Sequence, residues 1–122
     1  MSRTRVARGE AGERWAARAL RACGYHLLDQ RWRIVGGEID LIARDGDEYV
    51  FVEVKARRGD RFGTPELAVT PRKLTFLARA AEQWLADAIG DAPATWRIDV
   101  VAVELDRRDQ PTRITILQQF EL

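Results

Sequence analysis

Two short apolar segments that carry charged residues constrain the fold of this chain most. Residues 37–43 (Gly-Glu-Ile-Asp-Leu-Ile-Ala) and 49–55 (Tyr-Val-Phe-Val-Glu-Val-Lys) have the β-branched and aromatic content of strands, and residues 44–48 between them have the composition of a hairpin turn. The pattern predicts two adjacent antiparallel strands. Charges within such apolar strands are costly to bury unless each finds a partner or a metal.

The alternation of side chains along the strands indicates which charges lie together. Glu53 and Lys55 share a face with Tyr49 and Phe51, because successive side chains of a strand point to opposite faces. The same alternation places three apolar residues on one face of the first strand: Ile39, Leu41 and Ala43. The other face carries both Glu38 and Asp40, and the spacing alone does not choose which of these carboxylates joins Glu53.

The remaining elements follow from helical periodicity and from turn residues. We predict a helix over 9–23, strands over 25–34, 96–105 and 112–117, and a second helix that begins at Pro71 after the N-cap Thr70 and ends before Gly90. The apolar stripe predicted for the second helix is Leu74, Leu77, Ala78, Ala81, Trp84, Leu85 and Ala88. The order αβββαββ predicts one α/β domain over residues 1–122, with a mixed central sheet flanked by helices.

Composition excludes several classes of protein. The chain is 46% hydrophobic and 32% charged, and it has no apolar run near the roughly 20 residues that span a membrane, so we expect a cytoplasmic protein with no membrane partner. One cysteine and one histidine exclude a zinc site. Cys23 is predicted to be a buried thiol, His26 a surface or packed side chain, and the four tryptophans packing residues.

Charge is distributed in alternating blocks. Residues 1–33 and 54–79 are basic, residues 34–53 and 80–122 are acidic, and the net charge is only +1. A positive rim around the acidic hairpin would suit a polyanion bound over a metal, although ordinary solvated charge would give the same pattern. Only Lys55 and Lys73 among the twenty basic residues are lysines, which favours sites that need a compact charge with an adjustable pKa.

Three further groups of residues are functional candidates. Glu13 lies at the edge of the first helix's apolar stripe, so it either points toward the sheet or favours the helix dipole. Arg57, Arg58 and Arg61 follow the second strand of the hairpin and would either grip phosphate oxygens or remain solvated. Lys73 opposes the dipole in the first turn of its helix, which indicates a contact elsewhere, and we include it among the nucleic-acid-binding candidates.

An acidic residue on one strand and Glu-x-Lys on the next is a pattern suited to phosphodiester hydrolysis with a divalent metal. Asp40, Glu53 and the backbone carbonyl of Val54 would provide oxygen ligands for Mg²⁺ or Mn²⁺. Lys55 would orient the attacking water or offset charge in the transition state, and Glu13 would assist from the helix. The alternative is that Glu53 and Lys55 form a structural ion pair.

The order of these motifs resembles a known family. The matching segments are Gly12-Glu13, Ala16-Ala17, Gly24-Tyr25, residues 37–43, residues 51–55, Phe62-Gly63, Lys73 and residues 97–101. In these segments the chain resembles the YraN-like uncharacterised bacterial proteins of the restriction-endonuclease-like PD-(D/E)XK superfamily, which is related to archaeal Holliday-junction resolvases. The resemblance implies a restriction-endonuclease-like fold and a site of Glu13, Asp40, Glu53 and Lys55. Ile39 stands where that superfamily often has proline.

Two functions are consistent with this resemblance. The first is a Mg²⁺-dependent DNA endonuclease that acts on branched or damaged DNA, and the second is a catalytically silent nucleic-acid-binding or assembly module of the same fold. The related resolvases are dimers, which makes a homodimer one expected assembly. The intact Asp40, Glu53 and Lys55 favour the nuclease.

Overall fold

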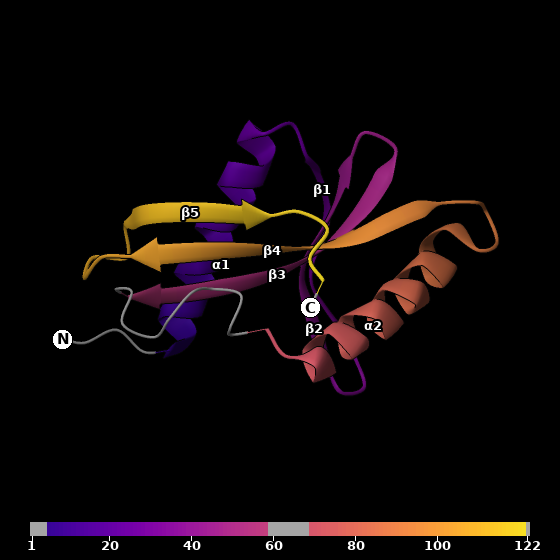
Figure 1. The fold of residues 1–122 in the computed structure, drawn as a ribbon, viewed down its shortest axis with the longest axis horizontal. Helices are drawn as coiled ribbons and strands as arrows, with labels where there is room; N and C mark the ends of the chain where they lie inside the picture. Colours follow the sequence, from indigo (N-terminus) through magenta and orange to yellow (C-terminus); the bar gives the residue numbers. More distant parts are fainter. Residues whose placement is uncertain (1–4, 59–68, 122) are drawn as a thin grey trace.

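The structure, a computed structural model, describes residues 5–58 and 69–121 (Figure 1). Its elements are α1 (Arg5–Ala22), β1 (His26–Ile34), β2 (Gly37–Asp45), β3 (Glu48–Arg58), α2 (Pro71–Ile89), β4 (Thr95–Leu105) and β5 (Pro111–Leu117). The predicted α/β class and the order αβββαββ are confirmed. Within the described residues no helix is long and apolar enough to cross a membrane.

The five strands form one mixed sheet in the order β1-β2-β3-β4-β5. Neighbouring strands are antiparallel except β3 and β4, which are parallel and stay in register from Glu48↔Thr95 to Arg58↔Leu105. Parallel neighbours need a crossover connection, and α2 lies within it. The β2–β3 hairpin turns through Gly46 and Asp47, where Gly46 adopts a φ of +63° that favours glycine.

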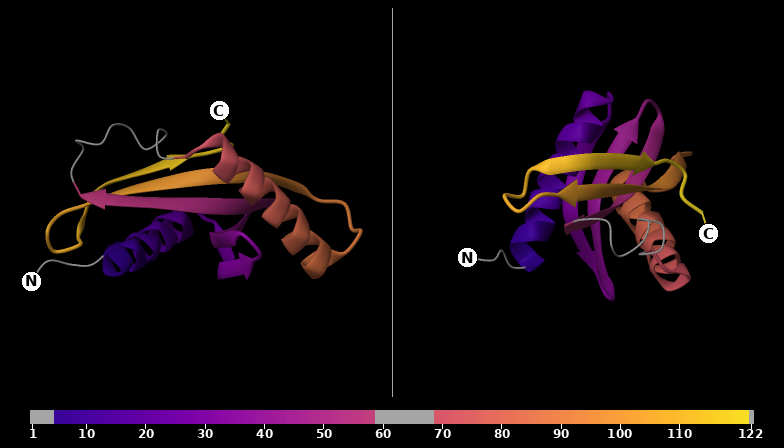
Figure 2. Two further views of the ribbon diagram at one scale, coloured as in Figure 1. Left: turned by 90° about the horizontal axis from the view of Figure 1, so that it is seen from below. Right: turned by 60° about the vertical axis from the view of Figure 1, so that its left-hand side comes forward.

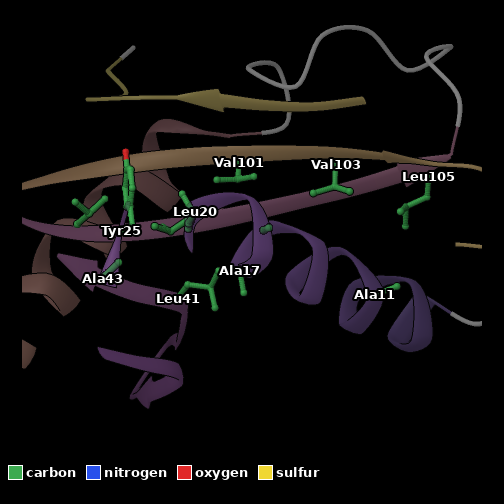
Figure 3. Close-up of a cluster of buried hydrophobic side chains, with 12 residues drawn as sticks. Ala11, Ala17, Leu20, Tyr25, Leu41, Ala43, Val101, Val103 and Leu105 are labelled. Atoms are coloured by element: carbon green, nitrogen blue, oxygen red, sulfur yellow. The ribbon is translucent and has the colours of Figure 1, made fainter. Parts of the chain in front are cut away.

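The two helices cover opposite faces of the sheet (Figure 2). Val50 and Val52 of β3 pack in the cluster under α1, whereas Phe51 between them packs under α2, as the alternation predicts. Figure 3 shows the α1 cluster, in which Ala17 and Leu20 of the helix meet side chains of β2 and β4. The tryptophans are partly buried against one cluster or the other, so their predicted packing role is confirmed: Trp15, Trp32, Trp84 and Trp96.

The strands β2 and β3 separate part of the way along the hairpin. Their pairing runs from Asp45↔Glu48 to Leu41↔Val52 and ends there, although β3 continues to Arg58 beside β4. Among the described residues, the rest of β2 pairs with β1 alone, as far as Ile34↔Gly37, and Figure 1 shows β2 turning away from β3. We call this opening between residues 37–40 of β2 and residues 53–58 of β3 the fork.

Three details of the predicted core are wrong. Ile39 packs with Ile42 under α2 and not with Leu41 under α1, because strict alternation does not hold where β2 leaves the hairpin. Cys23 is exposed, since the chain turns at Gly24 (φ +92°) and buried Tyr25 takes the next core position. In α2, Phe76 and Ala80 are buried although they lie outside the predicted stripe, and Ala88 of that stripe is exposed.

Candidate metal centre

Five predicted site residues line one cavity at the fork. The cavity has a volume of about 430 Å³ and is lined by Gly9, Glu13, Asp40, Glu53, Val54, Lys55 and Ala56. The acids come from α1, β2 and β3, so the fold brings together residues up to 40 positions apart in the chain. Asp40 and Glu53 are buried, with 9% and 4% of their surface exposed, while Glu13 and Lys55 are half-buried.

Asp40 holds the fork open through a hydrogen bond to the backbone. The backbone N–H of Val54 donates to Asp40 Oδ2 at 2.8 Å. If β2 and β3 remained paired here, this N–H would instead donate to a backbone carbonyl of β2. The N–H and C=O of a strand residue point to the same neighbouring strand. The Val54 carbonyl therefore faces the fork too, where it lies beside the two buried carboxylates.

The electrostatic environment of Asp40 favours its neutral form. Burial, a hydrogen bond with the Glu53 carboxyl and the charge of Glu53 raise the pKa of Asp40 from 3.8 to about 9, in that order of importance. The Val54 N–H acts in the opposite direction, because it stabilises the carboxylate, and the charge of Glu13 adds a smaller upward effect. Two carboxyl groups in one buried site thus interact unfavourably when both are ionised, and a cation would relieve this interaction.

Glu53 forms an ion pair with a lysine of α2. Lys73 Nζ of α2 lies 3.2 Å from Glu53 Oε2, and this buried oxygen has no hydrogen-bond partner within the described parts of the chain. Lys73 therefore belongs to the centre itself, in agreement with the prediction that its unfavourable helix position serves a contact elsewhere. Within residues 5–58 and 69–121, Lys55 makes no ion pair with Glu53, so the alternative of a structural Glu53–Lys55 pair is wrong for the described structure.

Glu38 is a further carboxylate close to Asp40. Carboxylate oxygens of Glu13, Glu38 and Asp40 all lie within 4.8 Å of one another. Glu38 is ion-paired with Arg33 at 3.1 Å, whereas Asp40 is the acid that enters the fork. The structure thus places both carboxylates that the spacing left open in one acidic group, and it gives Asp40 the contact with Glu53.

Glu13 reaches this group because α1 packs closely on β3. Gly12 is buried, and a Cβ atom at this position would overlap Ala56 Cβ, so only glycine permits the present approach of the helix. Arg31 of β1 also forms an ion pair with Glu13, and the Arg31 Nε atom lies 2.7 Å from Glu13 Oε2. The backbone of Arg31 has a φ of +50°, an uncommon conformation for arginine.

Sequence reasoning did not identify Gly12 and Arg31 as parts of the site. Gly12 was visible only as the neighbour of Glu13 in the matched motif, and no local signal distinguishes Arg31 from the other arginines. Of the predicted basic loop, Arg57 and Arg58 lie at the end of β3, and Arg58 NH2 is 3.3 Å from Asp109 Oδ1. Arg61 lies outside the described residues.

A second buried charge network stands apart from the fork, at the other end of β3 and β4. Arg97 donates from Nε to Asp99 Oδ1 at 2.9 Å and from NH2 to Asp45 Oδ2 at 2.9 Å. Asp99 is completely buried and also accepts from the hydroxyl of Tyr25 at 3.0 Å and from the N–H of Gln119 at 3.0 Å. The network joins the start of β1, the β2–β3 hairpin, β4 and the C-terminal segment, so its role is to stabilise the sheet.

The fold and the site together define a small α/β protein with an acidic cluster and two lysines at a fork in its sheet. The chain belongs to the uncharacterised protein family UPF0102, whose family model matches residues 12–103. This is the YraN-like family that the sequence resembles. The matched region contains Glu13, Asp40, Glu53, Lys55 and Lys73.

Individual relatives agree with this assignment. The chain is 54% identical over 96 residues to a UPF0102 protein of Symbiobacterium thermophilum, a match that covers 79% of this chain and 80% of the relative. It is 47% identical over 110 residues to a UPF0102 protein of Kineococcus radiotolerans, covering 90% of each chain. It is 41% identical over 118 residues to a UPF0102 protein of Moorella thermoacetica, covering 97% of this chain and 98% of the relative.

Proposed function

We propose that this protein is a cytoplasmic Mg²⁺-dependent DNA endonuclease with a restriction-endonuclease-like fold, which hydrolyses phosphodiester bonds of branched or damaged DNA. The observation that carries the proposal is the convergence of Asp40, Glu53 and Val54 at the fork, beside Lys55. The order of the matching motifs supports it, because their resemblance to the PD-(D/E)XK superfamily implies these residues as the catalytic set.

The donor set fits a hard divalent cation. Mg²⁺ prefers oxygen ligands and keeps several waters, so the carboxylates of Asp40 and Glu53 and the carbonyl of Val54 are sufficient protein ligands. Glu53 Oε2, which is buried without a hydrogen bond among the residues described, is the kind of atom that such a cation would satisfy. A bound Mg²⁺ or Mn²⁺ would lower the pKa of a coordinated water and polarise a phosphoryl oxygen.

The other residues of the cavity have roles that follow from their positions. Lys55 lines the same cavity as the acids, where its ammonium group can hold the attacking water or offset charge that develops on the phosphate. Glu13 can accept a hydrogen bond from that water at the α1 side of the cavity. Lys73 balances the buried charge of Glu53 from the α2 side.

The test is cleavage of labelled single-stranded, duplex, flap and four-way-junction DNA, and of a matched RNA, with Mg²⁺ or Mn²⁺. Glu53→Gln keeps the size of the side chain and removes its charge, and Glu82→Gln, on the exposed face of α2, is the matched control. We expect cleavage to require the metal. Glu53→Gln should lower the cleavage rate by more than the roughly 10- to 100-fold that is typical when a residue next to a metal ligand is replaced. Glu82→Gln should have no effect.

Other results would contradict the proposal. Cleavage of RNA alone would change the substrate class, and cleavage that persists in Glu53→Gln would remove this residue from the catalytic set. Failure of the wild type to cut any substrate, with folding and DNA binding intact, would favour the catalytically silent binding module. Sedimentation of the same samples would establish whether the active species is the expected homodimer.

A further inference from the structure

A cationic groove lies at the N-terminal end of α2. It has a volume of about 800 Å³ and is lined by Gly36, Thr70, Arg72, Lys73, Thr75, Phe76 and Arg79. Among the described residues that line it, three are cations and none is acidic, which contrasts with the mixed charge of the rest of the chain. The groove therefore has the electrostatic character of a site for an anion.

Two of the three described cations in this groove are available to a ligand, because Lys73 is already paired with Glu53. Arg72 and Arg79 have no ion-pair partner among residues 5–58 and 69–121, and the Arg79 guanidinium lies 5.9 Å from the centre of the Phe76 ring. The first turn of α2 contains no acidic residue, so the positive end of the helix dipole adds to the charge of the side chains.

The hydroxyl groups that line the groove already have partners within the helix. The Thr70 hydroxyl accepts from the N–H of Lys73 at 3.1 Å, and the Thr75 hydroxyl donates to the carbonyl of Pro71 at 3.0 Å. Neither hydroxyl is positioned mainly for a ligand. Recognition in this groove would consequently depend on positive charge, which is typical of contacts to a phosphate backbone.

Lys73 joins the groove to the metal centre. Its ammonium group lies 3.2 Å from Glu53 Oε2 and 5.1 Å from the centre of the Phe76 ring, which is part of the groove. A polyanion that entered the groove would therefore meet the fork at Lys73. Lys73 therefore lines the groove and also contacts a carboxylate of the metal centre.

The opposite wall of the groove is the turn between β1 and β2. Gly36, which has a φ of +102°, lies against Phe76, and a Cβ atom on Gly37 would approach the same ring to 3.1 Å. Val35, which comes directly before Gly36 in this turn, is 95% exposed. An exposed apolar side chain beside a cationic groove matches a nucleic acid, which presents charged phosphates together with apolar sugar and base surfaces, better than it matches a free phosphate ion.

We propose that this α2 groove binds the sugar–phosphate backbone of the nucleic acid beside the bond at the fork, with Arg72 and Arg79 as the phosphate contacts. The inference rests on the proposed function for the position of the cleaved bond, whereas the binding itself does not require catalysis. It adds to the site two residues that the sequence did not single out. Binding through phosphates alone would be independent of base sequence.

The experiment measures binding without cleavage. The full chain, in EDTA, is titrated into fluorescein-labelled duplex DNA, single-stranded DNA and RNA, and anisotropy is followed between about 50 and 200 mM salt. The variants are Arg72→Gln, Arg79→Gln and the double variant, and the matched control is Arg107→Gln on the exposed β4–β5 turn. Circular dichroism establishes that each variant is folded.

We expect each groove variant to weaken binding about tenfold and to reduce the slope of log K against log salt by about 0.9, with roughly twice that reduction in the double variant. The control should bind as the wild type does. Groove variants that bind like the wild type, or a wild type that binds none of the three probes, would overturn the inference. So would inorganic phosphate that displaces the probe completely at low millimolar concentration, since the ligand would then be a free anion.

The same samples separate this inference from the proposed nuclease. Glu53→Gln should lose cleavage and keep groove-dependent binding. If the wild type binds through Arg72 and Arg79 but cuts nothing, the nuclease proposal fails and the groove remains. If the wild type cuts DNA and the groove variants cut it with unchanged KM, the groove inference fails and the nuclease remains.

Discussion

Replacement of Asp40 by asparagine should stabilise the metal-free protein. The pKa of Asp40 is raised from 3.8 to about 9, so between these values the folded protein binds a proton that the unfolded chain releases. Folding stability is therefore lost as pH rises from about 4 to about 9. Asparagine resembles the protonated side chain: its carbonyl can accept from the Val54 N–H, and its amide can donate to Glu53.

The size of this effect follows from the shift in pKa. Each pKa unit corresponds to about 1.36 kcal/mol, so at pH 7 the shift from 3.8 corresponds to about 4 kcal/mol, which is an upper limit because polar relaxation lowers such costs. At pH 5 the same reasoning gives only about 2 kcal/mol. We expect Asp40→Asn to gain stability over the wild type, and to gain at least about 1 kcal/mol more at pH 8 than at pH 5.

Urea unfolding in EDTA at both pH values measures this difference. Asp47→Asn in the exposed β2–β3 turn is the control, and its stability relative to the wild type should not change with pH in this way. Added Mg²⁺ should then stabilise the wild type more than Asp40→Asn, because the variant lacks a charged ligand. An Asp40→Asn protein that is less stable than the wild type at pH 8, or a gain that is equal at the two pH values, would refute the reasoning.

Two further substitutions test how the site is supported. Gly12→Ala should destabilise the protein by about 1 to 3 kcal/mol, because its methyl group overlaps Ala56, whereas Gly9→Ala has open space and should be neutral or stabilising in thermal melts. An equally mild effect of both changes would mean that α1 does not depend on this close approach. Asp99→Asn should cost about 3 to 5 kcal/mol in urea unfolding, since it removes the completely buried carboxylate of the three that the partly buried Arg97 contacts, and a cost below about 1 kcal/mol would contradict that role.

Local sequence signals predicted the elements of this fold because they depend on neighbouring residues. Thr70 and Pro71 mark the start of α2, and Thr70 accepts from the Lys73 N–H as an N-cap does. Alternation placed Phe51 and the valines of β3 on the correct faces, since β3 is held straight between its neighbours in the hairpin and in the parallel ladder.

The details that the sequence did not predict depend on where the strands lie in space. Ile39 packs in the other cluster because β2 is not paired with β3 before Leu41. The alternation of residues in β2 gives no sign of where this pairing ends. The partner of Glu53 is Lys73, which comes from α2 across the sheet face and not from the next position along β3. Arg31 likewise contacts Glu13 only because β1 runs beside α1.

The fork explains how one carboxylate can serve both the fold and the site. Where β2 stops pairing with β3, the backbone N–H of Val54 would be left without a partner, and the Asp40 side chain accepts from it. The same interaction keeps Asp40 beside Glu53, where the two buried carboxyl groups interact unfavourably when both are ionised. Because β3 remains paired with β4 as far as Arg58, the sheet holds this unfavourable arrangement in place. A site that is destabilising in the metal-free protein is what a preorganised cation site requires, since the free energy of binding then includes relief of that repulsion.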